Sequence, residues 1–86
     1  MPFVYMVRCS DDTLYTGYTT EIERRLEEHN RGTAAKYTRG RTPVELVYCE
    51  EVPGVSEGLT REHEIKQLTR EKKEQLIADY SSQNHR

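Results

Sequence analysis

The stretch that decides the fold is FVYMVRCSDDTLYTGY, residues 3–18. Its first part, Phe3 to Cys9, is mainly β-branched and aromatic and predicts a strand. The polar cluster SDDT at 10–13 predicts a turn, and Leu14 to Tyr18 predicts the returning strand. The first 18 residues are therefore expected to form a hairpin. Gly17 is unusual inside a strand, because glycine weakens strands and often marks a bulge or a close approach by a ligand's backbone.

A helix and a third strand are expected next. Thr20 and Glu23 have the spacing of a capping box, and Gly32 is typical of a helix end, so the first helix should run from about Glu21 to Arg31. Residues 31–42 are expected to form a loop. The segment VELVYC, 44–49, predicts a strand that is closed by Pro-Gly at 53–54.

Two helices are expected in the remainder of the chain. The second helix should begin at Ser56 and run to about Leu68, and Thr69 should cap the third. The order is strand, strand, helix, strand, helix, helix. This pattern predicts an α+β fold in which helices flank a three-stranded, mainly antiparallel sheet.

Length and composition indicate one small folded domain. The 86 residues carry 13 Lys and Arg against 15 Asp and Glu, a net charge of −2, so low hydrophobicity is not combined with the high net charge of disordered chains. The domain should span 1–86, with its core at about 3–78 and a C-terminal tail, 81–86, that we expect to be disordered. No apolar run approaches the roughly 18 residues of a membrane span, and the first residues do not resemble a signal peptide.

The cysteines and histidines favour a reducing compartment over a zinc site. Cys9 and Cys49 are too few for a disulfide scaffold, which indicates a cytoplasmic protein. Together with the histidines they show no zinc-type spacing.

Two polar residues lie on the apolar stripe of the first helix. Ile22, Leu26 and His29 follow helical spacing, and Arg25 lies on the same side. One interpretation is structural, with Arg25 extended along its aliphatic stem and His29 packed as a half-buried aromatic. The other is that both project into a functional site.

A carboxylate is expected on the apolar face of the second helix. Glu62 falls within an arc formed by Val55, Leu59, Ile65 and Leu68. A carboxylate in such a place must be paired, protonated or metal-bound, because burying it alone costs several kcal/mol. An ion pair with Arg25 and a ligand for a hard cation such as Mg²⁺ are both open.

The hairpin and the loop add candidate residues. Tyr5 and Tyr15 come from the two strands, and Tyr15 precedes Gly17, where a phosphate backbone has room to approach. The loop RGTAAKYTRGR, 31–41, contains cations and an aromatic but no acid, a composition that suits phosphate contact and base stacking. A solvated loop explains the same charge. A sequence pI near 5.9 argues against non-specific coating of DNA.

In this order, the residues resemble the GIY-YIG nuclease domain, and in particular its small stand-alone bacterial members (UPF0213-like). Phe3-Val4-Tyr5 corresponds to Gly-Ile-Tyr, and Tyr15-Thr16-Gly17 corresponds to Tyr-Ile-Gly. Arg25 matches the catalytic arginine, His29 the polar residue one turn on, and Glu62 the metal-binding glutamate. The resemblance covers about residues 3–78. It departs from the family at Phe3-Val4, and at Tyr18, where related repair nucleases often have lysine.

The resemblance implies hydrolysis of DNA phosphodiester bonds, structure-specific and in repair or recombination, on branched or damaged DNA. One Mg²⁺ or Mn²⁺ ion would be held by Glu62, and Arg25 would stabilise the phosphate. Tyr15 would take the proton from the attacking water, and Tyr5 and His29 would orient the water, Tyr15 or the scissile phosphate. His29 is the alternative candidate for the base. Nucleic-acid contacts are expected from Gly17, Arg31, Lys36, Tyr37, Arg39, Arg41 and Lys66. The alternatives are a non-catalytic or partner-activated nucleic-acid binding module, its protein partner unknown, and a domain whose Arg25 and Glu62 are purely structural.

Overall fold

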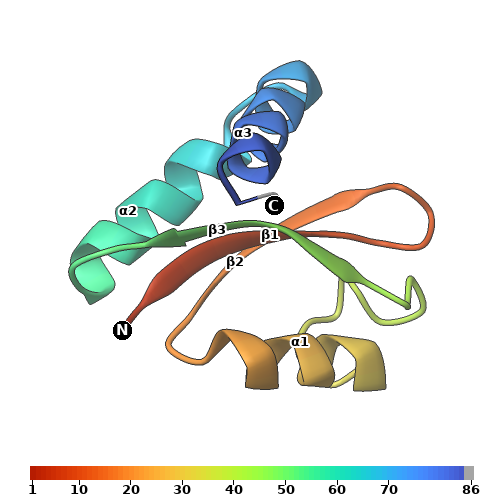
Figure 1. The fold of residues 1–86 in the computed structure, drawn as a ribbon. Coiled ribbons are helices and arrows are strands. Elements are labelled where there is room, and N and C mark those ends of the chain that lie inside the picture. The colour runs from red at the N-terminus through yellow and green to blue at the C-terminus, as the bar shows by residue number, and fades with distance from the viewer. Residues whose placement is uncertain (85–86) are drawn as a thin grey trace.

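The computed structural model describes residues 1–84, which form three strands and three helices (Figure 1). The elements in chain order are β1 (Phe3–Arg8), β2 (Leu14–Thr19), α1 (Ile22–Arg31), β3 (Glu45–Glu51), α2 (Val55–Lys66) and α3 (Arg70–Asn84). This is the expected ββαβαα order, and the α+β prediction is confirmed. The disordered tail expected from residue 81 is not found at residues 81–84, because α3 continues to Asn84; residues 85–86 lie outside the described part of the chain.

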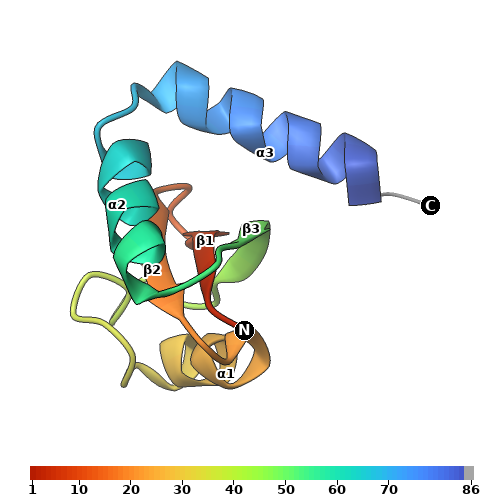
Figure 2. The ribbon, with the colours of Figure 1, turned by 90° about the vertical axis from the view of Figure 1, so that its left-hand side faces the viewer.

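The sheet has β1 in its centre. Its strand order is β2-β1-β3, and both neighbours pair antiparallel with β1. Helix α1 covers one face, while α2 and α3 lie on the other (Figures 1 and 2). Because both faces are covered, β1 is buried on both sides, and its side chains alternate between two separate cores.

Each face of the sheet has its own hydrophobic cluster. Toward α2 and α3, the buried residues are Val4, Met6, Tyr48, Val52, Ile65 and Ile77. Toward α1, the buried residues are Tyr5, Val7, Cys9 and Val44, with Tyr15, Ile22, Leu26 and Leu46 packed against them. The tyrosines of the candidate site therefore belong to the α1 face.

The start of α1 differs from expectation and its end does not. The expected capping box at Thr20 and Glu23 is not formed, because the N-cap is Glu21, which makes no side-chain capping bond. Instead, the Glu21 N–H donates to Thr19 Oγ1 over 3.1 Å. Gly32 closes the helix with φ of 80°, a left-handed conformation that favours glycine.

The buried face of α2 also differs from the expected one. Val55 and Leu59 are 60% and 53% exposed, whereas Gly58 and Ile65 are buried. The Tyr18 ring lies directly against Gly58, where an added Cβ would lie within 2.6 Å of two ring carbons. The helix is thus turned so that glycine, rather than the apolar pair, faces the sheet. Glu62 remains on the inner side, with its side chain 18% exposed.

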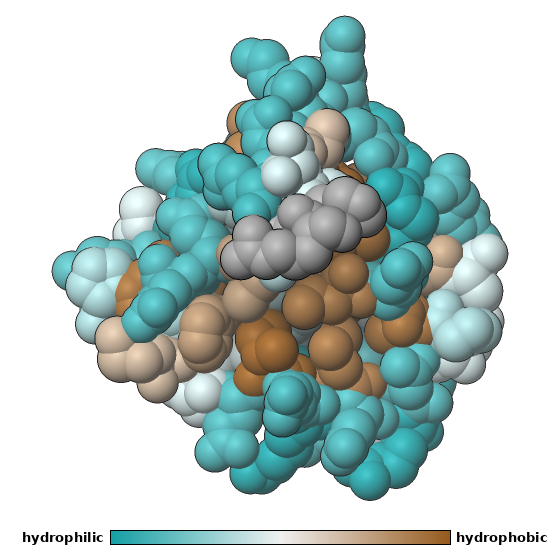
Figure 3. Space-filling view, in the orientation of Figure 1, coloured by the Kyte–Doolittle hydropathy of each residue, from teal (hydrophilic) through white to brown (hydrophobic). Residues whose placement is uncertain are grey.

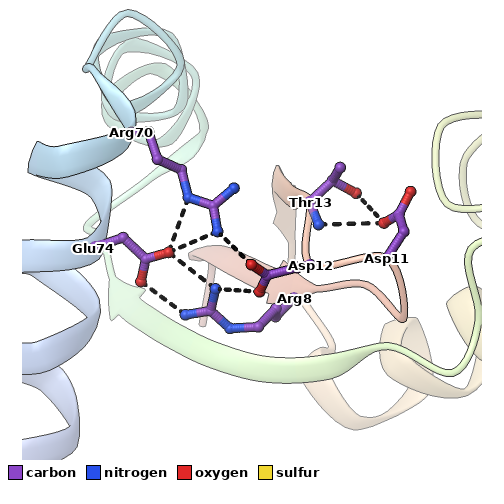
Figure 4. A network of polar contacts seen from close by, with 6 residues as sticks. All are labelled: Arg8, Asp11, Asp12, Thr13, Arg70 and Glu74. Carbon is purple, nitrogen blue, oxygen red and sulfur yellow. Dashed lines mark hydrogen bonds and ion pairs between the residues drawn. The ribbon is translucent and has the colours of Figure 1, made fainter.

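An ionic network holds α3 to the hairpin turn (Figure 4). Arg8 donates two hydrogen bonds to Glu74, of 2.9 and 2.8 Å. Arg70 contacts the same carboxylate at 2.9 Å and reaches Asp12 at 3.3 Å. The network therefore joins the end of β1 and the hairpin turn to α3. Glu74 is shared between the guanidinium groups of Arg8 and Arg70.

The surface is mainly hydrophilic in the view of Figure 3, with hydrophobic residues gathered in the middle of that face, where β3 crosses in Figure 1. Within residues 1–84, no helix combines the length and apolar character needed to cross a bilayer.

Candidate active site

The centre of the candidate site is a hydrogen-bonded chain through His29, which is fully buried. Tyr5 Oη lies 2.7 Å from His29 Nε2, and His29 Nδ1 lies 2.8 Å from Thr38 Oγ1. The Thr38 hydroxyl donates to the carbonyl oxygen of Ala35 over 3.2 Å. Since a hydroxyl has a single proton, Thr38 Oγ1 must accept from His29, which places a proton on Nδ1. Nε2 of neutral His29 then accepts from the Tyr5 hydroxyl.

The surroundings keep both of these groups neutral. Burial, followed by the positive charge of Arg25, lowers the pKa of His29. Burial raises the pKa of Tyr5, with Tyr15 and Glu62 acting in the same direction and Arg25 opposing them. The neutral phenol is therefore a donor to a neutral imidazole.

Gly17 makes room for the Tyr5 phenol. A Cβ added at Gly17 would lie 2.6 Å from Tyr5 Oη and 3.0 Å from a ring carbon of Tyr15. The site thus needs glycine on β2 because the side chain of the neighbouring strand occupies that space. Contact between Gly17 and a phosphate backbone stays a prediction.

An aromatic array leads from this centre to the surface. The Tyr15 ring centroid lies 5.2 Å from that of His29 and 6.5 Å from that of Tyr5. On its other side, Tyr15 lies 5.8 Å from Tyr37, which is 42% exposed. The Arg41 guanidinium lies over the Tyr37 ring, 4.5 Å from its centroid, where a cation is attracted by the π face.

The charges of Arg25, on α1, and Glu62, on α2, both affect the pKa of the Tyr5 phenol. They do not form the ion pair with each other that the sequence left open. Arg25 Nε lies 3.3 Å from Glu28, and Glu62 lies 2.8 Å from the Lys66 ammonium. Each partner is within one helical turn, which requires no long-range placement.

The residues fit a divalent ion held by one protein carboxylate. Within residues 1–84 there is no group of three or more His, Cys, Asp or Glu side chains arranged around a common point. Mg²⁺ commonly keeps several waters and takes one or two carboxylates together with substrate phosphates, so Glu62 is a sufficient ligand in kind. Its side chain is mostly shielded from solvent and its charge acts on the Tyr5 phenol, which suits that role.

The candidate nucleic-acid contacts fall into two groups. Among the described residues, the cations Arg31, Lys36 and Arg39 of the loop have no ion-pair partner. Arg41 pairs with Asp11 at 2.7 Å and Lys66 pairs with Glu62, so the charges of these two cations are already partly neutralised by acids of the protein.

Thr38 was not anticipated from the sequence, although it sets the tautomer of His29. Asn30 was also missed: it bridges to Val44, accepting from the Val44 N–H over 2.7 Å and so fixing the end of the loop beside α1. A threonine in a polar loop carries no periodic signal. The asparagine immediately after His29 was the more accessible clue, because polar residues at helix ends often bind neighbouring backbone.

Comparison with known proteins shows the family of the chain. The model of the GIY-YIG catalytic domain matches residues 1–75. A UPF0213 protein of Natronomonas pharaonis is 61% identical over 77 residues, which cover 90% of this chain and 91% of that protein. A UPF0213 protein of Staphylococcus aureus is 56% identical over 77 residues, covering 90% and 94%.

Two solution NMR structures share the fold. That of a UPF0213 protein from Bacillus halodurans has a TM-score of 0.58 and 47% identity, covering 91% of this chain and 84% of that chain. That of a protein from E. faecalis has a TM-score of 0.62 and 43% identity, covering 98% and 90%.

Proposed function

Because the chain belongs to the GIY-YIG catalytic domain family, a nuclease family, we propose that it is a metal-dependent endonuclease that hydrolyses phosphodiester bonds in DNA. The proposed substrates are branched or damaged DNA, in repair or recombination. The observation that carries the proposal is that one phenol, Tyr5, is hydrogen-bonded to the neutral imidazole of His29 and is influenced by the charges of Arg25, from α1, and Glu62, from α2. General acid–base and electrostatic groups at one place are what phosphodiester hydrolysis requires.

His29 is proposed to receive the proton of the attacking water through Tyr5. Tyr5 is fully buried, so the step requires the water to reach Tyr5 Oη past the partly exposed Tyr15 ring. As the water gives its proton to Tyr5 Oη, the Tyr5 proton passes to His29 Nε2 over the 2.7 Å hydrogen bond. The phenol need not ionise beforehand, which suits its raised pKa. The hydrogen bond from Nδ1 to Thr38 holds the ring in the tautomer that leaves Nε2 free to accept. Tyr15 is proposed to orient the phosphate or the water from the rim of the site.

Arg25 is proposed to stabilise negative charge on the phosphate oxygens as the water attacks. Its ion pair with Glu28 keeps the guanidinium on the side of α1 that carries His29. Glu62 would hold one divalent ion, Mg²⁺ or Mn²⁺, which when bound supplies Lewis-acid stabilisation of the leaving oxygen. For Glu62 to bind an ion, the ammonium of Lys66 must move off the carboxylate, and it is then free to contact phosphate.

The deciding experiment compares cleavage of plasmid, flap, junction and RNA substrates in Mg²⁺ and Mn²⁺. We expect Glu62→Gln to reduce cleavage by about 100-fold or more and Tyr5→Phe by about 100- to 10,000-fold. Glu64→Gln is the matched control, since Glu64 lies on the same helix, is 57% exposed and pairs with Arg61. Equal activity of Glu62→Gln and Glu64→Gln would refute the assignment of Glu62.

A second candidate is a nucleic-acid binding module that is inactive alone or needs a protein partner. The 2.8 Å contact between Lys66 and Glu62 favours it, because it occupies the carboxylate that the metal requires. Binding of DNA by wild type without cleavage of any substrate, in either metal, would support this candidate. Cleavage by wild type that Glu62→Gln abolishes would exclude it.

We also propose a cytoplasmic location. Its support is chemical: Cys9 and Cys49 are both free thiols, as is usual in a reducing compartment.

A further inference from the structure

Among the described residues, the cations without an ion-pair partner lie in two short segments. In the part of the chain that the structure describes, most arginines and lysines form ion pairs with nearby acids. The exceptions are Arg31, Lys36, Arg39, Lys72 and Lys73. For a chain with a net charge of −2, these are the positions where an anion meets positive charge that no acid of the protein already neutralises.

A surface cleft lies where these segments meet. It has a volume of about 200 Å³ and is lined by Thr13, Leu14, Tyr37, Arg70 and Lys73. Its walls come from the hairpin turn, the loop after α1 and the first turn of α3. Lys73 is half-buried in this wall yet has no acidic partner among the described residues, whereas Arg70 is held in place by Glu74 and Asp12.

The cleft adjoins the candidate active site through a shared aromatic pair. Tyr37, one wall of the cleft, lies 5.8 Å from Tyr15, whose ring in turn lies 5.2 Å from that of His29. A strand whose scissile phosphate lies at Tyr15, the partly exposed edge of the candidate site, would therefore meet this cleft with an adjacent nucleotide.

We propose that this cleft is a nucleotide subsite that binds one unpaired nucleotide of a single-stranded segment next to the scissile bond. Lys73 and Arg70 contact its phosphate, and Tyr37 contacts its base. The position of the subsite relative to the scissile bond rests on the proposed function, whereas binding by the cleft does not.

The chemistry of the walls selects an unpaired nucleotide over a base pair. An aromatic side chain beside cations is the usual means of binding single strands, because an unstacked base has a free face and edge for the ring while its phosphate meets the cations. A base in a duplex is already covered by its neighbours. A cleft of about 200 Å³ is also smaller than the usual pocket for a drug-sized ligand, and suits a single base or phosphate.

The test measures binding of the full chain, without added metal, to two fluorescent DNAs: a blunt duplex and the same duplex with a single-stranded overhang. We expect Lys73→Gln and Tyr37→Leu each to weaken binding of the overhang DNA by about 3- to 10-fold and to leave duplex binding within about 2-fold. Lys73→Gln should also reduce the slope of log K against log salt by about 0.7, the value for one phosphate contact on a single strand.

Lys72→Gln is the matched control, because Lys72 is the adjacent, exposed lysine and does not line the cleft. Equal losses for Lys72→Gln and Lys73→Gln would overturn the subsite, as would equal affinity of wild type for both DNAs. Competition by polyglutamate as effective as that by an oligonucleotide of equal charge would also overturn it. Circular dichroism establishes that each variant is folded.

The outcomes separate this subsite from the nuclease assignment. Loss of overhang selectivity in Lys73→Gln, together with a wild type that cuts no substrate, supports the subsite and refutes the nuclease. Cleavage by wild type, together with no effect of Lys73→Gln on overhang binding, supports the nuclease and refutes the subsite.

Discussion

Replacing Gly17 with alanine is expected to disconnect Tyr5 from His29. The new Cβ would lie 2.6 Å from Tyr5 Oη, whereas ordinary contact begins at 3.4 Å, so the phenol must shift by about 0.8 Å or more. The hydroxyl lies between the new methyl group and the imidazole only 2.7 Å away. A displaced phenol therefore loses the geometry of this buried hydrogen bond.

The cost has three parts. Overpacking costs about 1–3 kcal/mol, and leaving a buried acceptor unsatisfied costs about 1–3 kcal/mol. Alanine is intrinsically better than glycine in a strand by about 0.5–1 kcal/mol, which offsets some of this loss. The free energy of unfolding should therefore fall by about 3 kcal/mol, against a total of about 4–13 kcal/mol for a domain of this length.

Urea unfolding and ¹⁵N NMR of the His29 ring measure the two consequences. Gly58→Ala is the matched control, because its Cβ would lie 2.4 Å from a Tyr18 ring carbon on the opposite face of the sheet. Both variants should be destabilised, but only Gly17→Ala should change the His29 Nε2 resonance. A Gly17→Ala protein with wild-type stability and an unchanged resonance would show that the phenol is not confined as described.

Three further outcomes are expected. Thr38→Val removes the acceptor of His29 Nδ1–H and should lower the free energy of unfolding by about 1–3 kcal/mol, with a shift in the His29 tautomer resonances; unchanged ring resonances would contradict the proton assignment. The lowered pKa of His29 means that the unfolded chain binds the proton more readily, so stability should be complete above pH 6.5 and fall as the pH drops below it, in urea titrations of wild type but not of His29→Gln. The Arg8 and Arg70 guanidinium groups hold the pKa of Glu74 at about 2, so the contribution of Glu74 to stability should be present above pH 4.5 and lost as the pH falls toward 2. Since Glu74 is partly exposed, Glu74→Gln should lower the free energy of unfolding by only about 1 kcal/mol at pH 7, measured by thermal or urea unfolding. A loss that does not change with salt concentration would refute an ionic origin.

Periodicity predicted which side chains share a face, and this explains what the sequence revealed of the site. Alternation along β1 and helical spacing in α1 bring Tyr5 and His29 to the same layer, where they are found. The role of His29 or Tyr15 as the proton acceptor stays a prediction. The partner on the far side of His29 was not predictable, because Thr38 lies in a loop whose backbone path follows no repeat.

One wrong prediction and one open alternative were decided by local contacts. The hydropathy pattern predicted that Leu59 would face the sheet. Instead, Gly58 faces the sheet, because its lack of a side chain leaves room for the Tyr18 ring, and Leu59 is exposed. Arg25 and Glu62 do not pair with each other. Each forms an ion pair with a residue one turn away on its own helix. Nearby charges require little ordering of the chain, and long-range pairing must exceed that advantage.

The bond network between the hairpin and α3 also sets an order of assembly during synthesis. Arg8 is synthesised well before Glu74, its bidentate partner. At about 5–20 residues per second, the first strand waits roughly 3–13 s for that partner. The nascent polypeptide thus carries Tyr5, Tyr15 and His29 before the carboxylate of Glu62 and the anchoring helix are made, so the candidate site stays incomplete until α2 has been synthesised.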